Sequence, residues 1–179
     1  MPAPSDAADN PFVQAAIAAG LPDLGHVPLF STGYGTETAL NSAPFLLTLD
    51  QFRAHFGHTP SRLALVDDFA AALGAIRAIG CTPVAAMIGG SMLRAAEAPN
   101  DLDCLLFYEI AAADPDAVVD ALPALLAQGG SDIKLCPVDA GLPTLLKRAI
   151  FFSHLFAYDR ASGTLAFGTI LIDLTEPPA

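Results

Sequence analysis

Apolar residues recur along the chain with two alternating spacings, which predict helices and strands in turn. Between residues 61 and 80 they step by three and four, as on the buried face of a helix, at Leu63, Val66, Phe69, Ala70, Leu73 and Ile76. The same spacing over residues 142–158 predicts a second long helix. Short apolar stretches predict buried strands at VAAMI and at 102–108, and further strands at 132–138 and at 164–174.

Capping residues and glycines mark two shorter helices. In TLDQFRAHFG, Thr48 or Asp50 can cap a helix that ends at Gly57. Asp114 caps another that ends at Gly129, with Pro123 as a flaw inside it. Residues 91–97 are long enough for a helical turn or two.

Helices and strands alternate in this order, which predicts an α/β (α+β) domain with a central mixed sheet of about four strands flanked by helices. Pro137 places the strand 132–138 near an edge of that sheet. We expect residues 1–40 to form a loosely structured N-terminal arm and residues 41–175 to form the domain.

Composition supports a single folded domain. The chain has 179 residues, of which 53% are apolar and 15% charged. No apolar run approaches the roughly 18 residues of a membrane span, and no leader is evident, so we expect a cytoplasmic protein. Two of the three cysteines, Cys104 and Cys136, fall inside apolar runs and are expected to be small buried side chains.

The net charge of −11, with only eight Lys and Arg, leaves no large basic face. Long DNA or RNA is therefore not an expected partner.

Two acids, Asp101 and Asp103, open the strand 102–108 in the segment PNDLD. Residues i and i+2 of a strand point to the same side, so the two carboxylates lie together. Like charges this close favour a neutralising cation, and Mg²⁺ prefers such oxygen ligands. The plainer interpretation is a solvated loop end.

The turn Gly89-Gly90-Ser91 precedes these acids. Glycines between a strand and a helix let backbone N–H groups approach an anion, and Ser91 adds a hydroxyl. A tight turn with a serine cap explains the same residues without a ligand.

Together the two segments resemble the nucleotidyltransferase superfamily that includes DNA polymerase beta. Its signature is an apolar residue, Gly, then Gly or Ser, a gap of roughly nine to thirteen residues, and acid-apolar-acid-apolar on a strand. Here the signature reads IGGS, nine residues, and DLDC. The chain is closer still to a group of small bacterial nucleotidyltransferase-like proteins, over about residues 45–174, through LTLDQFRAHFGHTPSRLALVDDF and FFSHLFAYDRASGTLAFGTILIDL.

The resemblance implies a nucleotidyltransferase-like fold, and an enzyme that moves a nucleotide from an NTP to a hydroxyl of a small molecule or protein. Gly89, Gly90 and Ser91 would hold the triphosphate, and Asp101 and Asp103 would bind two Mg²⁺ ions.

The superfamily completes its metal site with a third acid on a neighbouring strand. Asp132 is the best match, and Asp139 is the alternative if the strand register differs. Lys134 lies two residues beyond Asp132 on the same face and could meet a phosphate. Arg94 could also reach the phosphates, or it could be a solvent-facing helix charge.

Two other functional interpretations stay open. One is a catalytically inactive protein of the same fold that binds another protein, as an antitoxin or immunity-type partner does; the high negative charge and the apolar segment TLAFGTILIDL would suit an interaction surface. The other is a structural domain whose acids only solvate a loop.

Overall fold

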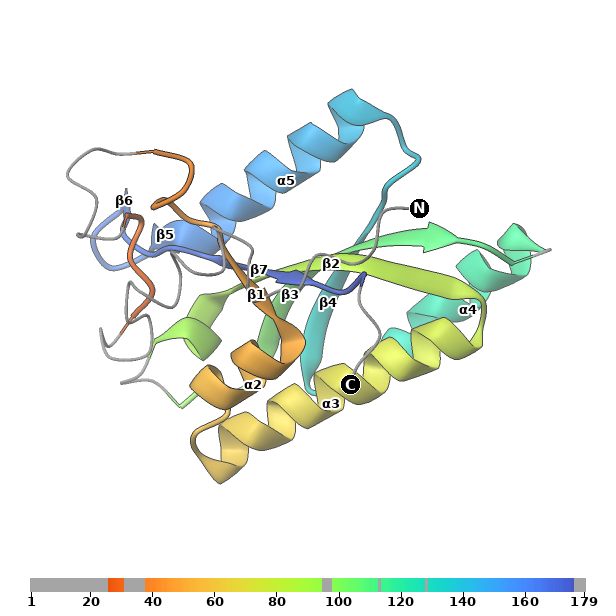
Figure 1. The fold of residues 1–179 in the computed structure, drawn as a ribbon, viewed down its shortest axis with the longest axis horizontal. Coiled ribbons are helices and arrows are strands. Elements are labelled where there is room, and N and C mark those ends of the chain that lie inside the picture. The colour runs from red at the N-terminus through yellow and green to blue at the C-terminus, as the bar shows by residue number, and fades with distance from the viewer. Residues whose placement is uncertain (1–25, 31–37, 95–97, 113, 128, 176–179) are drawn as a thin grey trace.

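Five strands form one mixed sheet in the computed structural model, which describes residues 26–30, 38–94, 98–112, 114–127 and 129–175. The strand order is β1-β7-β2-β3-β4, and the pairs β1–β7 and β3–β4 are parallel while the others are antiparallel. The bounds are β1 (Phe45–Thr48), β2 (Cys81–Gly89), β3 (Leu102–Ile110), β4 (Ser131–Pro137) and β7 (Ile170–Asp173). Figure 1 shows this sheet crossing the middle of the molecule.

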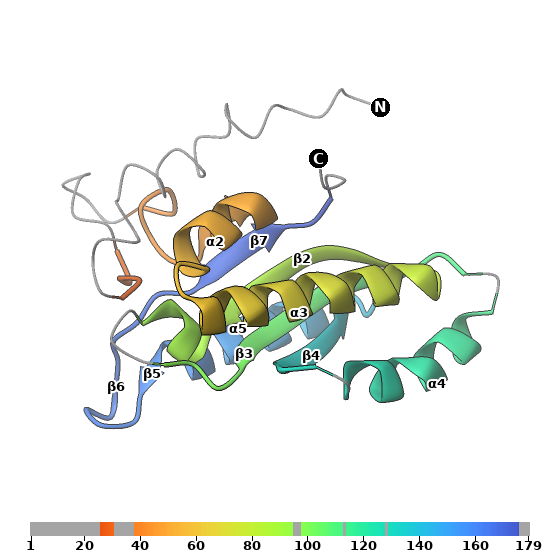
Figure 2. The ribbon, with the colours of Figure 1, turned by 90° about the horizontal axis from the view of Figure 1, so that it is seen from below.

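Helices cover both faces of the sheet (Figures 1 and 2). On one face lie α2 (Leu49–Phe56), α3 (Pro60–Ala78) and α4 (Pro115–Leu126), and their core contains Phe52, Phe69, Leu73, Leu106 and Leu122. The other face carries α5 (Leu142–Ala157), whose Phe156 packs in a smaller core with Met87, Leu105 and Phe107. The predicted α/β class and mixed sheet are confirmed. Within the described residues, no helix is both long and apolar enough to cross a membrane.

The predicted helix starts are confirmed by their caps. The Thr48 hydroxyl accepts the N–H of Gln51, whose side chain in turn accepts the Thr48 N–H, so α2 begins with a capping box. The Asp114 carboxylate accepts the Ala117 N–H at the start of α4. That helix continues through Pro123 to Leu126.

The sheet has five strands where four were predicted. The strand that was missed is β1, whose four residues FLLT are too few to show a clear period. The apolar segment 164–174 was predicted as one strand and is two. Thr164–Leu165 (β6) pairs with Tyr158–Asp159 (β5) in a separate small sheet, and β7 begins only at Ile170.

Gly168 explains the interruption between β6 and β7. Its N–H donates to the Val27 carbonyl, and a Cβ at this position would lie 2.0 Å from the Pro28 carbonyl oxygen. The backbone of residues 26–30 therefore packs tightly against the segment before β7, and Val27 is fully buried. These five residues fall within the predicted N-terminal arm; residues 1–25 and 31–37 lie outside the described part of the chain.

All three cysteines are free and buried, as predicted for Cys104 and Cys136. Burial raises the pKa of all three thiols, that of Cys81 to about 11. Because the thiolate is the reactive form, we expect the folded protein to resist modification at neutral pH. Ellman's reagent should label fewer than one thiol per chain in buffer and all three in guanidinium chloride. Rapid native labelling of one thiol would contradict this packing.

Candidate functional site

The structure brings Asp103 and Asp132 together across two neighbouring strands. β3 and β4 run parallel, and in their register Asp103 lies directly opposite Asp132. Both belong to the face of the sheet that α5 covers, because Leu105 and Cys136, at even spacing along the same strands, join the core beneath α5. Asp101, two residues before Asp103, adds its negative charge to the pair.

The same register separates the two alternatives for the third acid. Asp139 follows the far end of β4, where the Val138 N–H donates to the Tyr108 carbonyl. Asp139 therefore lies near the end of β3, and Asp132 near its beginning. At about 3.3 Å per strand residue the two positions are on the order of 20 Å apart. Only Asp132 is placed beside Asp101 and Asp103.

The Asp103 carboxylate lies in an environment that disfavours its charge. Burial raises its pKa, and the charges of Asp101 and Asp132 raise it further, while Lys134 and Arg160 act in the opposite direction. Ionisation of Asp103 therefore opposes folding. This cost is absent below the ordinary carboxyl pKa of about 4 and fully present above the raised one.

Asp103→Asn is accordingly expected to stabilise the protein at neutral pH. We predict a gain on the order of 1 kcal/mol at pH 7, measured by urea unfolding, because the substitution removes a half-buried charge beside two like charges. The gain should shrink as the pH falls through the ordinary carboxyl range. Asp120→Asn, at an exposed position of α4, is the matched control and should change stability little at either pH. A less stable Asp103→Asn protein at pH 7 would contradict the prediction.

Gly90 lies directly against the Asp103 carboxylate. Its φ is +70°, in the left-handed region, and a Cβ there would come within 1.9 Å of Asp103 Oδ2. Only glycine meets both conditions without strain. The turn therefore passes closely over Asp103, whose carboxylate fills the space that a side chain at residue 90 would take.

Gly89 has a different part in the structure. It is buried at the end of β2, opposite Asp103, and a Cβ there would lie 2.3 Å from Phe156 Cβ. Gly89 thus lets α5 approach the sheet beside the acids. Its observed contact is with packing side chains, so it supports the site through α5.

The helix predicted at residues 91–97 is shorter than expected. Gly90–Leu93 form one turn of 3-10 helix, in which the Ser91 carbonyl accepts the Arg94 N–H; residues 95–97 lie outside the described part of the chain. Ser91 is half-buried at this turn.

Arg94 and Lys134, the two predicted phosphate ligands, have other neighbours. The Arg94 guanidinium stacks on the Phe167 ring, with its carbon 3.9 Å from the ring centre. Lys134 Nζ donates to Asp132 Oδ1 over 2.7 Å. Lys134 is thus placed at the acids, as predicted, where it offsets part of their charge.

Two further arginines belong to the site and were missed. Arg160 carries a charge close enough to lower the pKa of Asp103. Arg62 of α3 is buried and donates from Nη1 to the Met92 carbonyl over 2.6 Å and from Nη2 to the Arg94 carbonyl. It therefore anchors the backbone that follows Gly90. A sequence signal existed for Arg62 alone, since it lies four residues before Val66 on the apolar stripe of α3.

The three carboxylates have the donor chemistry that Mg²⁺ prefers, and the backbone of Gly90 lies against one of them. Their side chains do not converge in this structure. Among the described residues, no three His, Cys, Asp or Glu side chains lie closely enough together to hold a metal ion. Asp132 faces Lys134 instead. A metal site here would need Asp132 to turn from Lys134 toward Asp103.

Comparisons with known proteins identify one family. Neither the curated proteins nor the solved structures include a match to this chain. Residues 33–173, well over half of the chain, match a family whose description is "Family of unknown function (DUF6932)". This match spans the acids, the glycine turn and every strand of the main sheet. The chain therefore belongs to the family DUF6932.

Proposed function

We propose that this chain is a Mg²⁺-dependent nucleotidyltransferase that moves a nucleotide from an NTP to a hydroxyl of a small molecule or protein. The observation that carries the proposal is the placement of Asp103 opposite Asp132, directly beneath Gly90. The order of the glycine turn, the acid pair and the third acid, which resembles the nucleotidyltransferase superfamily, supports it.

In this proposal Asp101, Asp103 and Asp132 would hold the magnesium. When bound, the metal would lower the pKa of an acceptor hydroxyl and stabilise the pyrophosphate that leaves. The backbone of Gly90 and Ser91 would hold the triphosphate, at the point where Gly90 lies against the Asp103 carboxylate. Lys134 would exchange Asp132 for a phosphate oxygen, which would free that carboxylate for metal.

The strain on Asp103 supports this assignment. A carboxylate whose pKa is raised by burial and by two like charges costs folding energy, and a bound cation would offset that cost. Groups that are strained in the folded state concentrate at functional sites.

Thermal-shift titration tests the proposal. With Mg²⁺ present, at least one NTP should raise the Tm of the unmodified chain, and Asp101→Ala should abolish that rise. Asp120→Ala on α4 is the control and should retain it. Label transfer from the α-phosphate of the same NTP to an added acceptor then tests turnover. The proposal fails if no NTP shifts the Tm, or if Asp101→Ala responds as the unmodified chain does.

A second function, binding of another protein by a catalytically inactive chain of this fold, is favoured by the outer face of α5. Its exposed apolar residues are Leu142, Leu146, Ile150, Phe151 and Leu155. An antitoxin or immunity-type partner could cover such a face. A chain that is monomeric by sizing chromatography and that transfers label from an NTP would count against this second function.

A further inference from the structure

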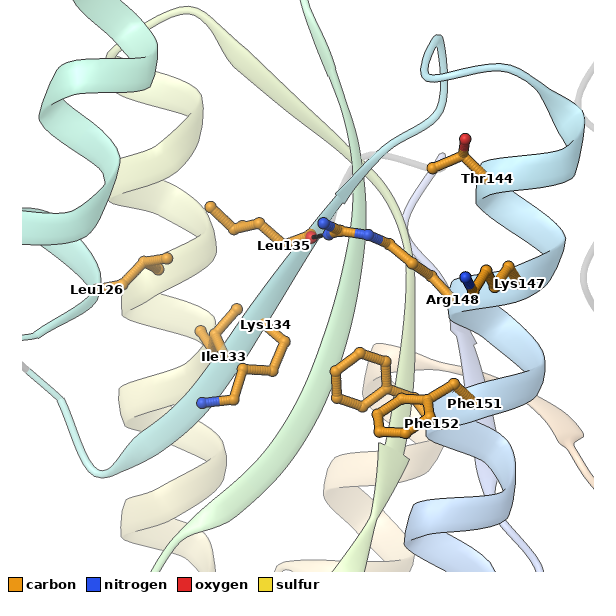
Figure 3. A pocket seen from close by; sticks show the side chains of 9 residues that line it. All are labelled: Leu126, Ile133, Lys134, Leu135, Thr144, Lys147, Arg148, Phe151 and Phe152. Carbon is orange, nitrogen blue, oxygen red and sulfur yellow. Dashed lines mark hydrogen bonds between the residues drawn. The ribbon is translucent and has the colours of Figure 1, made fainter.

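A groove lies beside the free edge of β4, between that strand and α5. Figure 3 shows β4 crossing the view, with Leu126 of α4 on one side and the side chains of α5 on the other. The cavity measures about 750 Å³, within the range of pockets that hold small organic ligands. It is separate from the turn at Gly90, although Lys134 takes part in both.

The groove combines an apolar lining with a cationic rim. Its apolar residues are Leu126, Ile133, Leu135, Phe151 and Phe152. Three of the chain's eight Lys and Arg residues also line it, although the chain as a whole carries a net charge of −11: Lys134, Lys147 and Arg148. Asp132 offsets the charge of Lys134, and Lys147 and Arg148 leave the local charge opposite in sign to that of the molecule. Such a groove complements a ligand with an apolar body and an anionic group.

An added peptide strand is the other occupant that an exposed edge suggests. Such a strand needs the outward-facing backbone carbonyls of β4. The Arg148 guanidinium reaches across from α5 and donates to one of them, the Leu135 carbonyl (Figure 3). The contact occupies an edge acceptor and places a cation over the groove, which favours a small ligand over a strand.

A second copy of the chain is also disfavoured as the occupant of this groove. A two-fold dimer through this groove would bring the same three cations of each copy toward one another.

We therefore propose that the groove binds a small amphipathic carboxylate, with its apolar body against Phe151, Phe152 and Ile133 and its carboxylate beside Lys147 and Arg148. The proposal does not depend on nucleotidyl transfer.

Calorimetric titration of the full chain with decanoate tests the proposal. One decanoate should bind per chain, and decyltrimethylammonium, with the same apolar body and a positive head, should bind at least about tenfold more weakly. Both probes are used well below their micelle-forming concentrations. Equal affinity for the two probes, or binding of several decanoates per chain, would overturn the proposal.

Matched variants localise the site. Lys147→Glu should weaken decanoate binding about fivefold, because it reverses one partly exposed charge at the rim. Arg77→Glu changes the net charge equally on α3, which packs on the opposite face of the sheet, and should leave the affinity within about twofold. Phe151→Ala should cost about tenfold, and Leu142→Ala, on the same helix but outside the groove, should not.

A folding control and three further results complete the test of the groove. Circular dichroism of each variant must match that of the unmodified chain, so a loss of binding reports the groove and not unfolding. If Lys147→Glu and Arg77→Glu weaken binding equally, the attraction is general and the proposal fails. It also fails if an acidic, apolar hexapeptide binds and decanoate does not, or if sedimentation detects a dimer that Phe151→Ala dissociates. Failure of NTP binding would leave all these readouts unchanged.

Discussion

Arg62→Met should lower the free energy of unfolding by about 3 kcal/mol, because it leaves the Met92 and Arg94 carbonyls without the guanidinium donor that Arg62 supplies. For a chain of this size, that loss corresponds to a Tm about 6–12 °C lower. Methionine keeps most of the apolar stem, so the effect isolates the lost hydrogen bonds. Urea unfolding at pH 7 measures it.

Arg77→Met is the control for this substitution. Arg77 lies on the same helix, its side chain is exposed, and the change should stay within about 0.5 kcal/mol. If Arg62→Met were no more destabilising than Arg77→Met, the backbone after Gly90 would not depend on this anchor. The assignment of Arg62 as the anchor of the glycine turn would then be wrong.

Gly90→Ala should destabilise the protein by about 2 kcal/mol or more. Alanine at a φ of +70° costs on the order of 1 kcal/mol, and its Cβ would displace the Asp103 carboxylate. Gly74→Ala provides a control that should change the free energy of unfolding in the opposite direction. Gly74 is exposed within α3, and no atom outside its own helical turn lies within 4 Å of the position that a methyl group would take. Alanine there should therefore stabilise the helix by about 0.5–1 kcal/mol.

A double-mutant cycle separates the two costs at Gly90. Combined with Asp103→Ala, Gly90→Ala should lose the part of its penalty that comes from the carboxylate and keep the backbone part. Additive effects would mean that Gly90 does not approach Asp103 as closely as the structure places it.

The long elements of the fold were predictable because their pattern of apolar residues extends over many positions. Nineteen residues of α3 and sixteen of α5 repeat the helical spacing several times, and the middle of β3, CLLFY, is an apolar run of five residues. Four-residue β1 offers no such repetition, and its pairing with β7 joins opposite ends of the chain. Gly168 divides the last apolar segment through a contact with Pro28, which no local pattern reveals.

For the candidate site, the sequence predicted where residues lie along the elements, but it did not predict which side chains contact one another. The i, i+2 spacing predicted that Asp101 and Asp103 lie on one side of a strand, whereas the choice between Asp132 and Asp139 needed the register of β3 and β4 that the structure shows. The stacking of Arg94 on Phe167 depends on a tertiary neighbour, whereas Lys134 pairs with Asp132, two residues before it on the same strand. Charge alone therefore did not show that Arg94 would stack on Phe167.

The central proposal is that the carboxylates beside Gly90 form a metal and nucleotide site. A crystal structure with Mn²⁺ and a non-hydrolysable NTP analogue tests this proposal most directly, because anomalous scattering locates the metal. We expect a Mn²⁺ peak between Asp103 and Asp132, with Asp132 released from Lys134 and the triphosphate against Gly90 and Ser91. Nucleotide bound elsewhere, or carboxylates left apart with Lys134 still on Asp132, would contradict it.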